Sequence, residues 1–410
     1  MNYHTFVLDN GLRIIHRPTA SPVVYCGYEL NVGSRNEEPG TEGMAHFCEH
    51  ATFKGTQRRR AWHILNRLES VGGDLNAFTN KEDTVYYVAI LKEHVARAID
   101  LLTDIVFHST YPQSELTKEV EVICDEIESY NDTPAELIFD DFENTIFEGH
   151  PLGHNILGSA ESVRSFTTED ARRFAARFYR PRNAVFFIDG DIDFKQVIGL
   201  LAKATADQPA HAPNSCETSQ QTLHHNYRPR LIIKDKGTHQ AHVMIGNRAY
   251  RTQHHHRTAL YLLNNILGGS GMNARLNLSL REHCGLVYTV ESTTASYADT
   301  GVWCIYFGCD RKDIDKCLRL IRRELNRLTD HRMTEYQLMA AKKQLKGQIG
   351  VACDNRESFA LDFGKSFLHY GQLKDIGTLY RRIDDVTPQQ IQQVAAEIMT
   401  EDRLTTLIYQ

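Results

Sequence analysis

The two halves of the sequence repeat the same order of elements, and this repeat constrains the fold more than any other feature. Residues 166–176 (FTTEDARRFAA) align with 386–396 (VTPQQIQQVAA), and in both runs a threonine precedes a helical pattern that a β-rich run follows. Residues 114–120 (SELTKEV) align with 334–340 (TEYQLMA) at the same offset of 220 positions. Two matches at one offset indicate that a single unit is used twice.

The length and the middle of the chain fit this duplication. The 410 residues are too many for one ordinary core and suit two domains of about 150 to 200 residues each. Residues 205–229 are polar, contain three prolines and lack both the helical and the strand period. We predict an N-terminal domain at 1–204, a linker at 205–229 and a C-terminal domain at 230–410.

Runs with strand and helix character occur in both halves. The strand-like runs are 23–32, 84–90, 231–233, 242–245 and 301–308. The runs with a helical period are 94–107, 115–129 and 312–328. This mixture predicts the α+β class, with two homologous domains that each have a mostly antiparallel sheet and helices packed on one face.

Composition and charge exclude several classes of protein. The net charge is -6 without a basic stripe, which argues against nucleic acid as the main partner. No apolar run approaches the ~20 residues that cross a bilayer, so we predict no membrane partner. The first residues alternate around Asn10-Gly11 like a hairpin and unlike a targeting sequence. The nine cysteines are odd in number and form no CxxC pair, which argues against a disulfide framework and a cysteine zinc site, so we predict a reducing, cytoplasmic location.

One short motif points to metal chemistry. Residues 46–50 (HFCEH) form a run compatible with a helix, in which His46, Glu49 and His50 share one face. The order H-x-x-E-H is that of inverzincins, in which imidazoles bind Zn²⁺ and a carboxylate accepts the proton of a water molecule. The motif alone is also compatible with an exposed helix face that carries two histidines by chance.

The next helical run offers a third ligand. Glu119 and Glu126 lie seven positions apart and therefore on one helix face. Glu126 would complete a catalytic zinc site of three protein ligands, and Glu119 would orient a ligating histidine. Ordinary solvent-facing glutamates fit the same spacing, so the spacing does not decide between the two interpretations.

Further runs accompany this motif along the chain. They are GSR at 33–35, FKGT at 53–56, NAFT at 76–79, IESYNDTP at 127–134, GGSGMNARL at 268–276 and YADTG at 297–301, with Arg281, Gly285 and Tyr288 between the last two. Together with HFCEH, Glu119 and Glu126, they make the chain similar over nearly its whole length to the pitrilysin and insulinase family of zinc peptidases, which includes the mitochondrial processing peptidase.

This resemblance implies an αβ-roll used twice, with one Zn²⁺ per chain in the first half and a second half that completes the substrate chamber. The zinc ligands that it implies are His46, His50 and Glu126. Glu49 would be the general base that activates the zinc-bound water, and Glu119 would support a ligating histidine from behind.

The same resemblance implies how a peptide substrate is held. The edge strand on which the peptide lies as an added strand would be formed by Asn76, Ala77 and Phe78. Arg281 and Tyr288 would bind the substrate carbonyl and stabilise the oxyanion.

The second half lacks the metal-binding residues. At the offset of 220, Met339 and Lys346 stand in the places of Glu119 and Glu126, and residues 263–270 (LNNILGGS) contain no histidine. We therefore predict one working site per chain.

The function that follows is that of a zinc-dependent endopeptidase acting on short or unfolded polypeptides. The alternative is a non-catalytic subunit or scaffold like those that also occur in the family. Because the chain has half the length of the single-chain members, we expect a homodimer, or a heterodimer with a related subunit. Arg281 and Tyr288 would then act on the zinc site of the partner.

Overall fold

A computed structural model describes residues 2–209, 227–373 and 375–410. In this structure the chain divides into two compact units. The first unit consists of Met1–Glu128, His154–Ser219 and Cys353–Asp375, and the second of Ser129–Gly153, Gln220–Ala352 and Ile376–Gln410. Most of the predicted linker at 205–229 lies outside the described residues, so the predicted domain boundaries stay a prediction.

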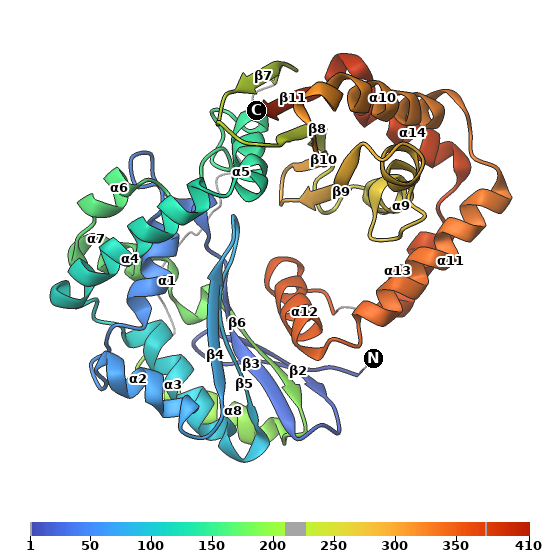
Figure 1. Ribbon diagram of the computed structural model, residues 1–410. Helices are drawn as coiled ribbons and strands as arrows, with labels where there is room; N and C mark the ends of the chain where they lie inside the picture. Colours follow the sequence, from blue (N-terminus) through green and yellow to red (C-terminus); the bar gives the residue numbers. More distant parts are fainter. Residues whose placement is uncertain (1, 210–226, 374) are drawn as a thin grey trace. The chain divides into compact units, whose positions relative to one another are not determined.

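The first unit is built on a six-stranded sheet in the order β1-β2-β6-β3-β5-β4 (Figure 1). Its strands are β1 His4–Val7, β2 Arg13–Pro18, β3 Val23–Leu30, β4 Asp74–Thr79, β5 Thr84–Leu91 and β6 Ala184–Gly190. Only β2 and β6 are parallel neighbours in this sheet. The antiparallel pairing of β1 with β2 confirms the predicted hairpin.

Helices cover both faces of this sheet. They are α1 Met44–Thr52, α2 Ala61–Glu69, α3 Val95–His108, α4 Gln113–Asn131, α6 Ala160–Ser165, α7 Thr168–Phe178, α8 Phe194–Ala204 and α12 Arg356–Tyr370. On β3, Tyr28 points to α3, where its hydroxyl lies 2.8 Å from that of Thr103. The next residue, Glu29, points to the opposite face, where α12 brings Gly364 against its carboxylate. Figure 1 shows α12 alone on that side of the sheet.

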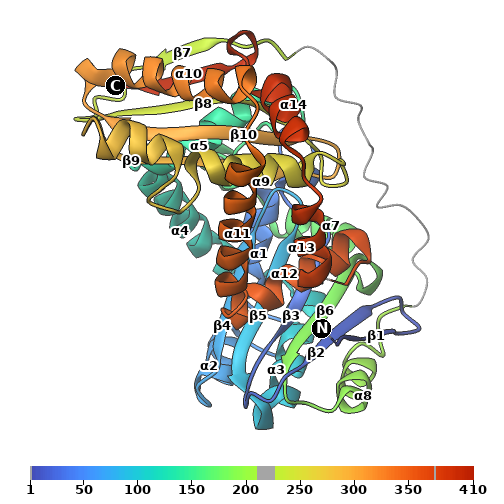
Figure 2. The same ribbon diagram turned by 90° about the vertical axis from the view of Figure 1, so that its right-hand side faces the viewer.

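The second unit has a five-stranded sheet in the order β7-β11-β8-β10-β9. Its strands are β7 Leu231–Lys234, β8 Ala241–Ala249, β9 Val287–Ser296, β10 Gly301–Cys309 and β11 Thr405–Tyr409. Its helices are α5 Pro134–Ile146, α9 Arg257–Gly268, α10 Ile314–Asp330, α11 Glu335–Ala352, α13 Ile376–Asp384 and α14 Pro388–Ile398. Figure 2 shows α9 and α10 on the near side of this sheet, and α5 packs on its other face.

The two sheets share one topology. The order β2-β6-β3-β5-β4 corresponds to β7-β11-β8-β10-β9, and the single parallel pair, β2–β6 or β7–β11, stands in the same place in both. Thr167 and Thr387 form the same capping box at the beginning of α7 and α14, as their aligned positions predict. The predicted α+β class with two homologous units is therefore confirmed, and helices pack on the second face of each sheet as well as on the predicted one.

Helices α5 and α12 add a reciprocal exchange to this plan. Helix α5 lies in the first half of the sequence and packs in the second unit, whereas α12 lies in the second half and packs in the first. Each covers the sheet face that the other helices leave open, because that face carries buried side chains such as Phe187, which contacts Phe363. None of the helices that the structure describes has the length and the apolar composition that a membrane span needs.

A buried carboxylate anchors α12 to the first sheet. Asp83, in the turn between β4 and β5, is fully buried and pairs with Lys365 (2.7 Å) and His369 (3.3 Å) of α12. Burial alone would raise the pKa of Asp83, but the hydrogen bond from His369 and the charge of Lys365 lower it to about 2. The docking of α12 therefore depends on ionised Asp83.

Replacement of Asp83 by Asn should destabilise the protein in a manner that depends on pH. The pKa falls on folding from 3.8 to about 2, so ionised Asp83 contributes stability that is complete above about pH 4 and lost as the pH falls towards 2. This shift corresponds to on the order of 2 kcal/mol. Melting temperatures of wild type and D83N should differ most at pH 5 and converge as the pH is lowered.

A constant difference between the two proteins from pH 5 to pH 2 would contradict this account. The control is D191N, which removes a carboxylate from a half-exposed pair with Lys92. That variant should lose less than about 1 kcal/mol at any pH, because exposed pairs contribute little.

Candidate metal centre

A buried glutamate fixes the beginning of α1, the helix that carries the H-x-x-E-H motif. Gly43 precedes the helix in the left-handed conformation (φ 98°), which glycine adopts without strain. The carboxylate of Glu37 accepts hydrogen bonds from the backbone N–H groups of Gly43 (2.9 Å) and Ala45 (2.8 Å), and it lies 2.9 Å from His154 Nε2. Because an anion at a helix N-terminus satisfies otherwise unpaired amides, these contacts set the position of α1.

The two sides of α1 differ in chemistry. Phe47, Cys48 and Ala51 are fully buried in the core of the first unit. His46 and Glu49 are also buried, with 7% and 8% of their surfaces exposed, and they cannot be the solvent-facing residues of an ordinary amphipathic helix. Buried imidazole and carboxylate groups need partners, and α4 supplies them.

Glu126 of α4 approaches both motif histidines. Its Oε2 atom lies 3.4 Å from His50 Nε2 and 3.8 Å from His46 Nε2. In the part of the chain that the structure describes, His46, His50 and Glu126 are the group of three potential metal ligands whose ligand atoms all lie within 4.8 Å of one another.

These separations suit a tetrahedral ion. Bonds of about 2.0 to 2.2 Å to a tetrahedral zinc ion place neighbouring ligand atoms roughly 3.3 Å apart. The observed 3.4 Å and 3.8 Å are close to that value, and two imidazoles with one carboxylate are a donor set of catalytic zinc sites. The residues therefore fit zinc, with one coordination position left for water or substrate.

Glu119 and Lys54 lie behind His50. The Nδ1 atom of His50 is 2.8 Å from Glu119 Oε1, so its Nε2 atom is directed toward Glu126. The ammonium group of Lys54 lies 2.5 Å from the other oxygen of Glu119. A carboxylate behind a ligating histidine fixes the tautomer and the ring orientation. His46 has no such support, because its Nδ1 atom is buried without a hydrogen-bond partner among the described residues.

The protonation of the cluster favours a cation. Burial lowers the pKa of His46 to about 4, and the charge of His50 adds to the effect, so His46 is neutral near pH 7. Burial opposes protonation of His50 too, but its hydrogen bonds to Glu119 and Glu126 raise the pKa to about 9. One proton is thus held between two carboxylates, where a divalent cation can replace it.

Glu49 lies beside these residues and contacts the edge strand. Burial raises the pKa of Glu49, whereas a hydrogen bond from Thr79 and the charge of His50 oppose the rise. The Thr79 hydroxyl donates to Glu49 Oε2 at 2.7 Å. Thr79 is the last residue of β4, which is the edge of the first sheet.

The predicted substrate-binding residues fall on both units. Asn76, Ala77 and Phe78 lie on β4, with Asn76 exposed and the Phe78 ring against Tyr87. Arg281 and Tyr288 lie on the second unit, Arg281 half-exposed in a π-helical turn and Tyr288 84% exposed on β9. The structure brings His46, His50, Glu49, Glu119 and Glu126 together within the first unit.

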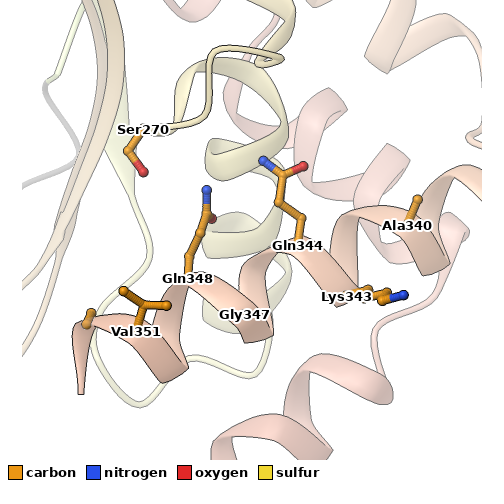
Figure 3. A pocket seen from close by; sticks show the side chains of 8 residues that line it. Ser270, Ala340, Lys343, Gln344, Gly347, Gln348 and Val351 are labelled. Carbon is orange, nitrogen blue, oxygen red and sulfur yellow. The ribbon is translucent and has the colours of Figure 1, made fainter. Parts of the chain in front are cut away.

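An open depression on the second unit does not include these residues. It has a volume of about 750 Å³ and is lined mainly by α11, with Ser270 opposite (Figure 3). Gln344 and Gln348 point from α11 toward the side on which Ser270 lies. Amides and a hydroxyl of this kind are no zinc donor set.

Three further residues belong to the site although the sequence patterns did not indicate them, namely Lys54, Thr79 and Glu37. Lys54 and Thr79 belong to the runs FKGT and NAFT, which were identified without a role for either residue. Their contacts with Glu119 and Glu49 join separate elements, so no local period reveals them. For Thr79, the sequence gives one indication of a role in the site. It is a polar residue directly after Asn76, Ala77 and Phe78, the predicted substrate strand.

Comparison with known proteins places this architecture in a family. The protein thus has two units of the same α+β topology and, in the part of the chain that the structure describes, one histidine–carboxylate cluster that could bind a metal. Residues 13–160 match the family described as Insulinase (Peptidase family M16), and residues 165–345 match its Peptidase M16 inactive domain. The chain belongs to this insulinase family, which confirms the resemblance seen in the sequence.

Similar proteins match nearly the whole chain. A Bacillus subtilis protein named uncharacterized zinc protease YmxG is 32% identical, over 98% of this chain and 97% of that protein. An uncharacterized zinc protease of Streptomyces coelicolor is also 32% identical, over 96% of this chain and 86% of that protein.

Solved structures share the fold. A protease from Helicobacter pylori has a TM-score of 0.93 at 22% identity, over 100% of this chain and 99% of that chain. A putative M16-like peptidase from Alicyclobacillus acidocaldarius has a TM-score of 0.86 at 20% identity, over 100% and 98%.

Replacement of Glu119 by Gln should weaken zinc binding by about 10- to 100-fold, because His50 loses the carboxylate that orients it. Competition with a chromogenic chelator measures this affinity without any assay of catalysis. The matched control is E121Q, which changes an exposed glutamate of the same helix. Equal zinc affinities for E119Q, E121Q and wild type would exclude Glu119 from the centre.

Proposed function

We propose that this protein is a zinc-dependent endopeptidase that hydrolyses short or unfolded polypeptides, with one zinc ion per chain held by His46, His50 and Glu126. The observation that carries the proposal is the convergence of these ligand atoms beside buried Glu49. The names of the similar Bacillus and Streptomyces proteins, both of which are called zinc proteases, support it.

When bound, the zinc ion would lower the pKa of a water molecule and polarise the peptide carbonyl. Glu49 takes a proton from the attacking water and delivers it to the nitrogen of the leaving amine. His46 provides a neutral imidazole, as burial requires, and Glu119 holds His50 in the tautomer that leaves its Nε2 atom available. Lys54 in turn keeps Glu119 ionised and oriented.

The peptide lies along β4 as an additional strand. This strand ends its sheet, so its outer edge offers backbone N–H and C=O groups for pairing. Because β4 finishes at Thr79, which contacts Glu49, a peptide paired with Asn76, Ala77 and Phe78 is brought next to the base. Arg281 and Tyr288 are assigned to the substrate carbonyl and the oxyanion.

We assign these two residues to the partner in a dimer. Tyr288 is 84% exposed, which is unusual for an aromatic side chain. This exposure supports a role in which another molecule covers the ring. A homodimer is the simpler form, because one chain carries both the zinc ligands and this pair. A heterodimer with a related subunit is the other form, and a cytoplasmic location is the expected one.

A non-catalytic scaffold is the competing function. In a scaffold, Glu49 would have no reason to stand in a buried position beside a complete ligand set. Zinc analysis together with a chelator-sensitive peptide assay distinguishes the two, because a scaffold would show no zinc-dependent hydrolysis.

Replacement of Glu49 by Gln should leave zinc bound and lower kcat on an unfolded polypeptide by at least about 10²-fold, because the amide cannot accept the proton. Zinc content by atomic absorption and cleavage by mass spectrometry measure the two effects. A chelator should abolish wild-type cleavage, and added zinc should restore it. The control is E69Q, at the exposed end of α2; full activity of E49Q would refute the role of this carboxylate.

Mixtures of two inactive variants test the action of Arg281 across a dimer. E49Q and R281A should each be nearly inactive, but co-refolded at equal amounts they should recover about a quarter of wild-type activity in a two-fold symmetric dimer. Half of the dimers then contain both chains, and each of these has one site with intact Glu49 and Arg281. An inactive mixture would show that Arg281 acts within its own chain, and an active R281A variant would show that Arg281 has no role.

A further inference from the structure

Thr79 is the residue outside the metal ligands that contacts Glu49 most directly. Its hydroxyl donates to Glu49 Oε2 at 2.7 Å, and both side chains lie within the first unit. Thr79 belongs to β4 and Glu49 to α1, so the hydrogen bond joins the edge strand to the helix of the metal centre.

Backbone hydrogen bonds to β5, to Asp83 and to Ser34 hold Thr79 and the residue that follows it. Thr79 pairs with Thr84 across the β4–β5 ladder. After it, the backbone N–H of Asn80 donates to Asp83 O at 2.8 Å, and the carbonyl of Asn80 accepts from Ser34 N at 3.1 Å. Asp83 is in turn anchored by Lys365 of α12. The Thr79 hydroxyl is therefore a fixed point against which the Glu49 carboxylate is held.

A hydrogen bond to one oxygen of a carboxylate has a chemical consequence. It stops rotation of the carboxyl group and leaves the second oxygen to accept a proton. A general base works within about 2.6 to 3.2 Å of the proton that it takes, and a small displacement lowers the rate strongly. The neighbouring charges of His50 and Glu126 act on Glu49 but do not hold a particular carboxylate oxygen.

We propose that Thr79 is a positioning residue for Glu49 and couples the base to the strand that takes the peptide. This inference rests on the proposed function, because it requires Glu49 to act as a base. Thr79 orients Glu49 Oε2, and Glu49 Oε1 serves the attacking water. The hydroxyl group, and not the methyl group, carries the role.

The experiment compares T79V and T79S with wild type. Valine keeps the shape of threonine without the hydroxyl, so T79V should lower kcat roughly 10- to 100-fold, the loss expected for a hydrogen bond to a charged group. KM and zinc affinity should stay within about twofold of wild type, because the variant changes neither the ligands nor the strand edge. Serine keeps the hydroxyl, so T79S should recover kcat to within a few-fold of wild type.

A matched control separates this effect from the general cost of losing a hydroxyl. T103V removes a buried hydroxyl in the same unit. That hydroxyl is hydrogen-bonded to Tyr28 and not to Glu49. It should lower the melting temperature without the loss of kcat. Crystal structures of T79V and T79S should show Glu49 displaced in the first and in place in the second.

The outcomes distinguish this inference from the function on which it rests. A wild-type protein without zinc-dependent hydrolysis overturns the proposed function and the inference with it. An active wild type and an inactive E49Q, together with full kcat in T79V, overturn the inference alone. Equal losses in T79V and T79S, or a change confined to KM, also overturn it, because they assign Thr79 to packing or to substrate contact.

Discussion

Each sheet has two faces that must be covered, and helices from its own half of the sequence cover one of them. The second face of the first sheet carries buried groups such as Glu29 and Phe187, which α12 covers. Because α12 comes from the other half of the sequence, neither half completes its unit alone. The anchor of α12 is Asp83, and this residue closes the turn that begins at Thr79. The same turn therefore anchors α12 on the sheet and holds Thr79 beside the candidate base, Glu49.

The charges of the neighbouring side chains determine what the face of α1 with His46, Glu49 and His50 can bind. Glu49, Glu119 and Glu126 bring three carboxylates to one small region, and Lys54 with a proton on His50 supplies the nearby positive charge. Burial makes unbalanced negative charge costly, so the region favours a cation. His46 stays neutral for the same reason and can donate a lone pair. The sequence spacing would permit solvent-facing glutamates, but the burial of Glu119 and the approach of Glu126 to both histidines favour the metal centre.

Local patterns predicted the parts of this site that lie on single helices. His46, Glu49 and His50 fall on one face through their spacing alone, and the same holds for Glu119 and Glu126. The duplication predicted two units and the capping boxes at Thr167 and Thr387. The exchange of α5 and α12 could not be predicted in this way. A helical period shows which face of a helix is apolar, but it does not show which sheet that face packs against. The bond from Thr79 to Glu49 spans 30 positions and depends on how β4 meets α1.

The second unit shows what the same scaffold does without a metal. On α11, Met339 is exposed and Lys346 pairs with Asp384 at 2.7 Å, in the places that align with Glu119 and Glu126. Near the position that aligns with the motif, Asn264 donates to the backbone of Ser292, whose hydroxyl bonds to Asn264 and Trp303. These neutral groups satisfy one another, so this network needs no cation, whereas the first unit retains an excess of carboxylates. Repeated topology therefore fixes where helices lie, and a few side chains decide which unit offers a set of potential metal ligands.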